Sequence, residues 1–179
     1  MEANEAQELK EQAEKGGESA LRPVAFTMSV LAVLVAVSTV LGHRTHTEAV
    51  LDQNKATDQW NEYQAKKIRS YNTGLASDLL GVATVSDKEA TQRIQKAYAD
   101  HQAKWADDLK QDQEKAEALE KKVENAEFRA NRFDLAEAML EIGLVITSVT
   151  LLTRSRIYWY LGFLFSILGI ISAASAYLP

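Results

Sequence analysis

The sequence has no cysteine, only 2 prolines and only 8 glycines among its 179 residues. The absence of cysteine excludes disulfides, thiolate zinc sites and a cysteine nucleophile. The scarcity of proline and glycine favours long helices, because these residues have the lowest helix propensities. A formal net charge of −5 argues against a nucleic-acid-binding protein, which normally presents a basic face. No pattern typical of a catalytic or cofactor site is present, so we expect no enzyme and no cofactor.

Two long apolar runs lie near opposite ends of the chain. The first, residues 23–42, carries no charge and opens with Pro23, a residue favoured in the first helical turn. The second, residues 157–178, begins with the aromatic stretch Tyr158 to Tyr160, which is typical of a membrane interface. About 20 apolar residues are needed to cross the hydrocarbon core of a bilayer. Both runs are therefore predicted to be transmembrane helices.

A third apolar run, residues 135–153, contains Glu137 and Glu141 one helical turn apart. The run is long enough to cross a membrane only if both carboxylates enter the membrane region, where charges are expensive. The glutamates could line an ion path, or they could pair with cationic residues that follow the first span. We favour pairing, with a clasp between Arg44 and Glu141, over conduction. The predicted polar cluster at the membrane boundary comprises His43, Arg44, His46, Glu137 and Glu141.

The histidines of this cluster also raise the question of a metal. His43 and His46 share a helix face, and a nearby glutamate could complete a zinc or iron site. No other residues have metal-ligand spacing, and histidines at a membrane interface are usually ordinary interfacial residues. The prediction is therefore no metal.

The charged segment between the first two spans, residues 43–134, is predicted to form an antiparallel coiled-coil hairpin that turns near residues 72–86. Gly74 and Gly81 lie in the turn region, and Ser86 with Glu89 predicts a capping box for the second helix. Apolar residues of the second helix step by three and four, with a stutter at His101 and a single carboxylate, Asp112. The predicted seam comprises Trp105, Leu109, Leu119, Val123 and Phe133.

The last span carries a stripe of small residues along one helix face. Such residues allow close approach of helix backbones, on which association in lipid depends. The stripe is expected to pack within the protomer or between copies. Its members are Gly162, Ser166, Gly169, Ala173 and Ala176.

The basic turn at residues 153–156 contains Arg154 and Arg156 and is predicted to be cytoplasmic. The N-terminus would then be cytoplasmic and the hairpin periplasmic, and the reverse orientation is the alternative. The acidic segment of residues 1–22 is expected to be a helical head before the membrane, interrupted at Gly16 and Gly17, or else a frayed tail.

Three segments together resemble a bacterial membrane-protein family known only as a domain of unknown function. They read VLAVLVAVSTVLGHRTHTEAV, DQWNEYQAKKIR and RFDLAEAMLEIGLVITSVTLLTRSRIYWYLG. The resemblance covers nearly all of residues 23–170. It implies a small membrane protein of the bacterial inner membrane with the order span, helical rod, span, span. The family offers no activity and no functional residues to carry over.

We therefore expect an all-α membrane protein with three transmembrane helices and an extramembrane helical hairpin. The expected function is that of a homo-oligomeric membrane scaffold, whose partners are the lipid bilayer and further copies of the chain. Another membrane protein is a further candidate partner, and nucleic acid is not. An oligomeric ion channel or transporter accessory lined by Glu137 and Glu141 is the alternative, and an envelope sensor is the weaker one.

Overall fold

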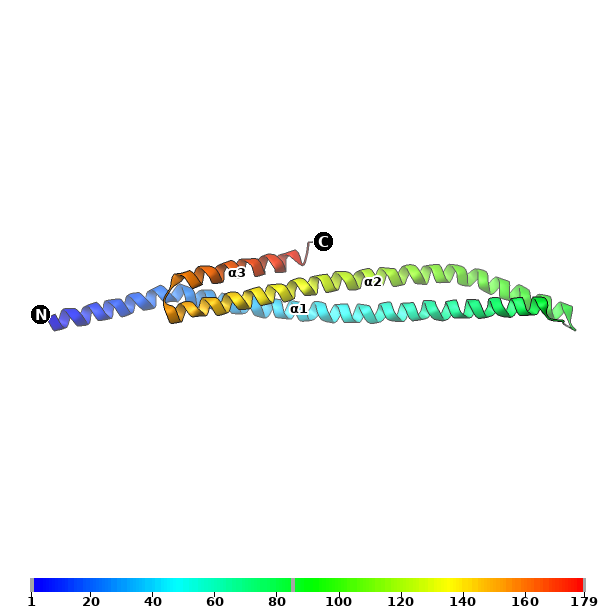
Figure 1. Ribbon diagram of the computed structural model, residues 1–179, viewed down its shortest axis with the longest axis horizontal. Helices are drawn as coiled ribbons and strands as arrows, with labels where there is room; N and C mark the ends of the chain where they lie inside the picture. The colour runs from blue at the N-terminus through cyan, green and yellow to red at the C-terminus, as the bar shows by residue number, and fades with distance from the viewer. Residues whose placement is uncertain (1, 85, 179) are drawn as a thin grey trace. The chain divides into compact units, whose positions relative to one another are not determined.

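The computed structural model describes residues 2–84 and 86–178, with side chains from Leu21 onward. Within these ranges the chain forms three helices and no strand. Helix α1 spans Glu2–Val82, α2 spans Lys88–Thr153 and α3 spans Arg156–Ser175 (Figure 1). The prediction of an all-helical chain is confirmed.

Each of the three helices contains a stretch that is long and apolar enough to cross a membrane. These stretches lie in the helical segments Leu21–Val82, Lys88–Thr153 and Arg156–Ser175. The count agrees with the three spans expected from the sequence.

The start of α1 differs from the prediction. The helix does not begin at Pro23, and it is not interrupted at Gly16 and Gly17, because it runs continuously from Glu2. Pro23 has no N–H, so one backbone hydrogen bond of the helix is missing there. The carbonyl of Pro23 also accepts a hydrogen bond of 2.8 Å from the Thr27 hydroxyl. Side chains of residues 1–20 lie outside the described ones, so the role of the acidic head stays a prediction.

The connection between α1 and α2 is short. Helix α1 continues through Gly74 and Gly81 to Val82, and α2 begins at Lys88. Asp87 caps α2, because its Oδ1 accepts a 2.9 Å hydrogen bond from the backbone N–H of Ala90. The predicted capping residue, Ser86, is therefore wrong by one position. Aspartate and serine cap equally well, and the sequence offers both in succession.

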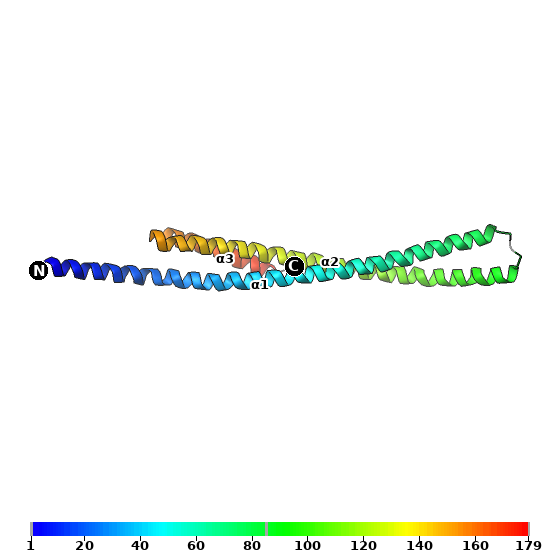
Figure 2. The same cartoon turned by 90° about the horizontal axis from the view of Figure 1, so that it is seen from below.

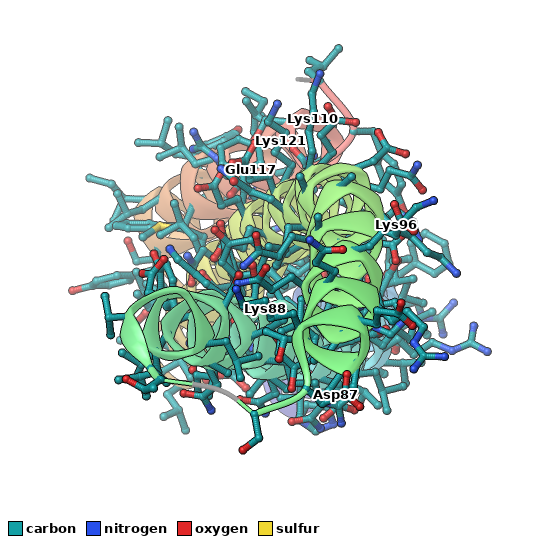
Figure 3. The ribbon with its side chains drawn as sticks, turned by 90° about the vertical axis from the view of Figure 1, so that its right-hand side faces the viewer. Asp87, Lys88, Lys96, Lys110, Glu117 and Lys121 are labelled. Atoms are coloured by element: carbon teal, nitrogen blue, oxygen red, sulfur yellow. The ribbon has the colours of Figure 1, made fainter. Side chains whose placement is uncertain are left out.

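The chain divides into two compact units. Unit 1 comprises Met1–His46 and Ala126–Pro179, and unit 2 comprises Thr47–Asn125. Within unit 2, the segments of α1 and α2 lie side by side in both views (Figures 1 and 2). Ala49 and Ala56 of α1 are buried there together with Ala116 and Val123 of α2. Lys96 and Lys110 extend outward from α2, as expected of a solvated face (Figure 3).

Unit 1 has a larger core, to which all three helices contribute. Helix α1 supplies Val24 and Leu31, and the largest fully buried apolar side chains are Phe133 and Leu140 of α2. The buried residues of α3 are small: Gly162, Ser166, Gly169 and Ser172. Leu140 of α2 packs against the small residue Gly169 of α3.

The basic turn between α2 and α3 is tight. Arg154 has a φ of 54°, in the left-handed region that glycine adopts most easily. Its backbone N–H still donates to the carbonyl of Thr150 at 2.9 Å, which closes the last turn of α2. An arginine is thus held in a backbone conformation that costs about 1 kcal/mol relative to right-handed helix.

Candidate functional site

The first candidate site is the predicted polar cluster where α1 and α2 meet in unit 1. Gly42 of α1 is buried, and a Cβ placed there would lie 3.2 Å from Asp134 Oδ1 and 3.6 Å from the Cβ of Phe133. The missing side chain therefore lets α2 approach α1 closely. One turn further along α1, His46 Nε2 lies 2.9 Å from Asp134 Oδ2, with both side chains half exposed.

Glu137 lies one turn after Asp134 on α2 and is held by a hydroxyl. The Thr39 Oγ1 hydroxyl lies 2.6 Å from Glu137 Oε1 and also 3.0 Å from the carbonyl of Val35. Because a hydroxyl has one proton, it can donate to only one of these oxygens at a time. Both groups are partly buried, where leaving a carboxylate without a donor is costly. The Thr39 hydroxyl thus explains how Glu137 is accommodated at this position.

The predicted clasp between Arg44 and Glu141 is not formed among the described residues. Both side chains are exposed. The contacts of Thr39 with Glu137 and of His46 with Asp134 place Arg44 and Glu141 about 8–13 Å apart along the helix axes, at 1.5 Å per residue. Arg44 also points about 140° away from Thr39 around α1, at 100° per residue. The register of the two helices therefore excludes the clasp.

The other members of the predicted cluster differ in their exposure and in their partners. His43 is exposed, although it takes part in another interaction. His46 and Glu137 have partners, but these are Asp134 and Thr39 rather than one another. No group of three or more potential metal ligands occurs among the described residues. The cluster is thus a set of separate polar contacts between two helices.

The second candidate site is the small-residue stripe of α3, which packs against α2. Gly162, Ser166, Gly169 and Ala176 are buried and Ala173 is half buried. A Cβ on Gly162 would lie 2.8 Å from the carbonyl oxygen of Gly143, and one on Gly169 would lie 2.9 Å from Leu140 Cγ. The stripe is therefore used within the protomer.

Gly143 of α2 is the counterpart of Gly162. A Cβ on Gly143 would lie 2.6 Å from Ser166 Oγ and 2.9 Å from the carbonyl oxygen of Gly162. Ser166 Oγ donates to that same carbonyl at 2.7 Å. Ser172, outside the predicted stripe, donates from its hydroxyl to the Arg132 carbonyl at 2.9 Å. Two glycines facing each other bring the backbones of α2 and α3 into direct contact.

Two threonine hydroxyls of α2 are fully buried in the same part of this helix. Thr147 and Thr150 are 0% and 1% exposed, and neither Oγ1 has a hydrogen-bond partner among the described residues. Thr147 Oγ1 lies where a Cβ on Gly162 would be. Such an oxygen can accept a weak Cα–H contact from a glycine, as is common where helices meet closely.

The third candidate site is the seam between α1 and α2 in unit 2, together with its continuation on α2. Val123 and Phe133 are buried, and Trp105, Leu109 and Leu119 are half buried. His101 is exposed and Gln102 is half buried in its place, with its Nε2 3.1 Å from where a Cβ on Gly74 would lie. The protected positions therefore step from 98 through 102, 105 and 109 without a break. The predicted stutter at His101 is wrong, because Gln102 rather than His101 is protected, and the exposed His101 ring lies 5.6 Å from the ring of Trp105.

Asp112 is the buried carboxylate of this seam, with 3% of its surface exposed. Lys66 of α1 reaches it with an Nζ to Oδ2 distance of 2.5 Å and also contacts Glu62 at 2.9 Å. The hydrogen bond to Asp112, followed by that to Glu62, raises the pKa of Lys66 above its usual value. Lys66 therefore carries its charge throughout the neutral range, and Asp112 is buried beside a permanent cation.

Several contact residues were not found from the sequence. Thr39, Asp134 and Gly143 carried no signal of their own, because each depends on a partner far away along the chain. Gly143 could have been found by extending the seam, since it follows Leu140 by three residues and precedes Thr147 by four.

These contacts define a class: an all-helical protein with three helices able to cross a membrane, joined by small-residue packing and isolated polar contacts. The chain belongs to the family described as a domain of unknown function, DUF4337, which matches residues 20–179. This confirms the resemblance to an uncharacterised family. No curated protein and no solved structure shows significant similarity to the chain.

The contact between α2 and α3 predicts unequal effects of two glycine-to-alanine substitutions. Gly162→Ala should destabilise the protein by about 2 kcal/mol, because the new methyl overlaps the Gly143 carbonyl and backbone must move. Gly81→Ala, also in a helix but with nothing within 4 Å, should be neutral or stabilise by up to about 1 kcal/mol. Thermal unfolding in detergent measures both. Equal effects of the two substitutions would contradict the direct backbone contact.

The buried ion pair predicts a non-additive double-mutant cycle. Lys66→Met should destabilise the protein by roughly 3 kcal/mol, because it leaves the Asp112 carboxylate buried without its cation. Adding Asp112→Leu should recover most of this loss. Because the pKa of Lys66 is raised, the contribution of the lysine charge to stability is complete below pH 10.5 and falls as the pH rises through the raised pKa. Additive effects in chemical unfolding would show that the pair is not coupled.

Proposed function

We propose that the protein is a homo-oligomeric membrane scaffold. Three transmembrane helices anchor it, and residues 43–134 form an antiparallel coiled-coil hairpin outside the bilayer, where copies associate. Its partners are the lipid and other copies of the chain. It has no catalytic role in this proposal.

Two contacts in unit 2 support the antiparallel hairpin. Trp60 Nε1 donates to Glu120 Oε1 at 2.8 Å, and Lys66 contacts Asp112 at 2.5 Å. As the residue number rises on α1, the number of its partner on α2 falls, which is the order expected of antiparallel helices. The many acidic and basic residues of this segment favour water over lipid as its surroundings.

The observation that carries the proposal is the apolar surface of α1 beyond the predicted span. Large apolar side chains there are 54–84% exposed although they belong to the charged, water-facing segment. A solvent-exposed apolar patch of this kind usually marks an interaction surface. The residues are Leu51, Ile68, Tyr71, Leu75, Leu79 and Val82.

The small-residue stripe of α3 supports this assignment by elimination. Its close contacts are with Gly143, Leu140 and Thr147 of α2, so it holds the protomer together. Contacts between copies are then expected mainly at other surfaces, and the exposed apolar side chains of α1 offer one such surface.

The proposed location is the bacterial inner membrane, with the N-terminus in the cytoplasm and the hairpin in the periplasm. Arg154 and Arg156 in the short turn between α2 and α3 favour a cytoplasmic turn, because short basic loops are retained there. The resemblance to a bacterial membrane-protein family supports the compartment.

A channel is the second candidate, and the exposure of Glu141 favours it. Glu141 lies within the apolar part of α2, one turn after Glu137, and has no partner within the described part of the chain. In an oligomer this carboxylate could face a shared path. Conductance in vesicles that is lost in Glu141→Gln, with assembly intact, would favour the channel. If the vesicles show no conductance, the scaffold remains the proposed function.

The mass of the solubilised protein, corrected for bound detergent, tests the proposed function. We expect one defined multiple of 19.9 kDa that persists in several mild detergents. Substituting the exposed Leu75 by serine should reduce this mass, whereas Arg69→Ser, a neighbouring exposed change, should not. A chain that remains monomeric in every detergent would overturn the proposal.

A further inference from the structure

The exposed face of α1 in unit 2 has a regular spacing. Every seventh residue is exposed from Asn54 through Asn61, Ile68, Leu75 and Val82. Ile68, Leu75 and Val82 are 58%, 60% and 84% exposed. The last three are apolar, and an apolar repeat of seven is typical of a left-handed coiled coil. We call these five residues the outer line.

The outer line lies opposite the face that α1 turns to α2. Lys66, which reaches Asp112, is about 160° from Ile68 around the helix, at 100° per residue. Ala49 and Ala56, the buried residues of the inner face, follow their own repeat of seven. Helix α1 therefore has two heptad faces, and α2 covers only one of them.

The positions that alternate with the outer line carry little charge. Thr57, Gln64 and Tyr71 follow members of the line by three residues, and all three are exposed. The fourth such position is Asp78, and Lys55, Asp58, Glu62, Lys67 and Arg69 lie at the positions between. An exposed strip with few charges in so charged a helix is expected of a surface that is covered in the assembly.

Together, these observations and the proposed function, on which this inference rests, point to one occupant. We infer that the outer line packs against the outer line of a second copy, in parallel and in register, about a two-fold axis along the rods. Copies anchored in one bilayer with the same orientation hold their rods parallel and bring equal residues to equal heights. The symmetry is that of the commonest homo-oligomeric interface.

Asn54 and Asn61 support this arrangement. Asparagine at the equivalent seam position of a parallel dimer faces its own copy and fixes the register, at a cost in stability. In an antiparallel pair centred on Leu75, Ile68 would face Val82 and the asparagines would find no counterpart. Asn54 and Asn61 thus favour the parallel pairing, and the apolar residues of the outer line stabilise it.

The charges beside the line are compatible with the same pairing. In a parallel coiled coil, the residue before each line position faces the residue five further along the partner. Lys67 then faces Asn72 of the second copy, and Gln53 faces Asp58. The only adverse residue is Asp78, but Leu79 follows Leu75 by four residues and is 58% exposed. With Leu79 as the residue between Leu75 and Val82, the repeat of seven is kept and Asp78 lies at the edge of the contact.

The buried area is adequate for association on a membrane. Burying a side chain of this size removes about 60–120 Å² of apolar surface from water. Five such residues per copy, with Tyr71 and Leu79 included, give roughly 600–1,200 Å² for the pair, at or below the lower limit of specific interfaces. Confinement to one bilayer raises the effective concentration and favours the pair further.

Disulfide trapping tests this surface, because the chain has no cysteine of its own. Single variants Ile68→Cys, Leu75→Cys and the control Arg69→Cys are placed in vesicles of phosphatidylethanolamine and phosphatidylglycerol and oxidised. Ile68→Cys and Leu75→Cys should form disulfide-linked dimers about tenfold faster than Arg69→Cys, because only their Cα atoms come within disulfide range. All three positions are exposed, so the substitutions leave the packing within the protomer unchanged.

Three results would overturn the inference. Equal rates at all three positions would indicate random collision. Faster linkage between mixed Ile68→Cys and Val82→Cys chains than within either variant would indicate antiparallel packing. If the chains are oligomeric by mass but form no disulfide, the outer line is not the interface and the scaffold function still stands. If the mass is that of a monomer, both the interface and the scaffold function are rejected.

Discussion

The structure depends on one buried face of α2. Protected positions on this helix step by three and four from Asp112 through Phe133 to Thr150. At Gly42 the helix meets α1, and at Gly162 and Gly169 it meets α3. Ala130, Phe133 and Ala136 are buried at two successive steps of three, which rotates the face as α3 is added to the contact. A helix without such a face could not hold two neighbours at these distances.

Polar groups on this face limit the ways in which the helices can slide. Asp112 needs Lys66, and Glu137 needs Thr39, because a carboxylate removed from water without a donor or a cation is costly. A shift of α1 against α2 by one turn would separate both pairs. The polar contacts thus fix the register of the helices. Small and apolar residues alone would specify this register less well.

The sequence predicted the helical class and three helices apolar enough to cross a membrane, because both follow from composition or local periodicity. The partners of the boundary carboxylates could not be predicted in the same way. Arg44 is the nearest strong cation in sequence, but the rotation of α1 and the register of α2 direct Thr39 and His46 to that contact instead. The prediction of a stutter at His101 was wrong for a related reason. The sequence favours the aromatic His101 over Gln102 as the seam residue, but Gly74 on α1 leaves room for the Gln102 side chain.

The central claim is that the face of α2 that steps by three and four packs on α1 within unit 2. The most direct measurement is a single-cysteine scan of residues 98–133, with the rate of reaction of each thiol toward a water-soluble maleimide. The structure predicts slow reaction at positions such as Gln102, Asp112, Ala116 and Val123, and fast reaction at His101. Uniform rates, or protection of His101 with rapid labelling of Gln102, would contradict it.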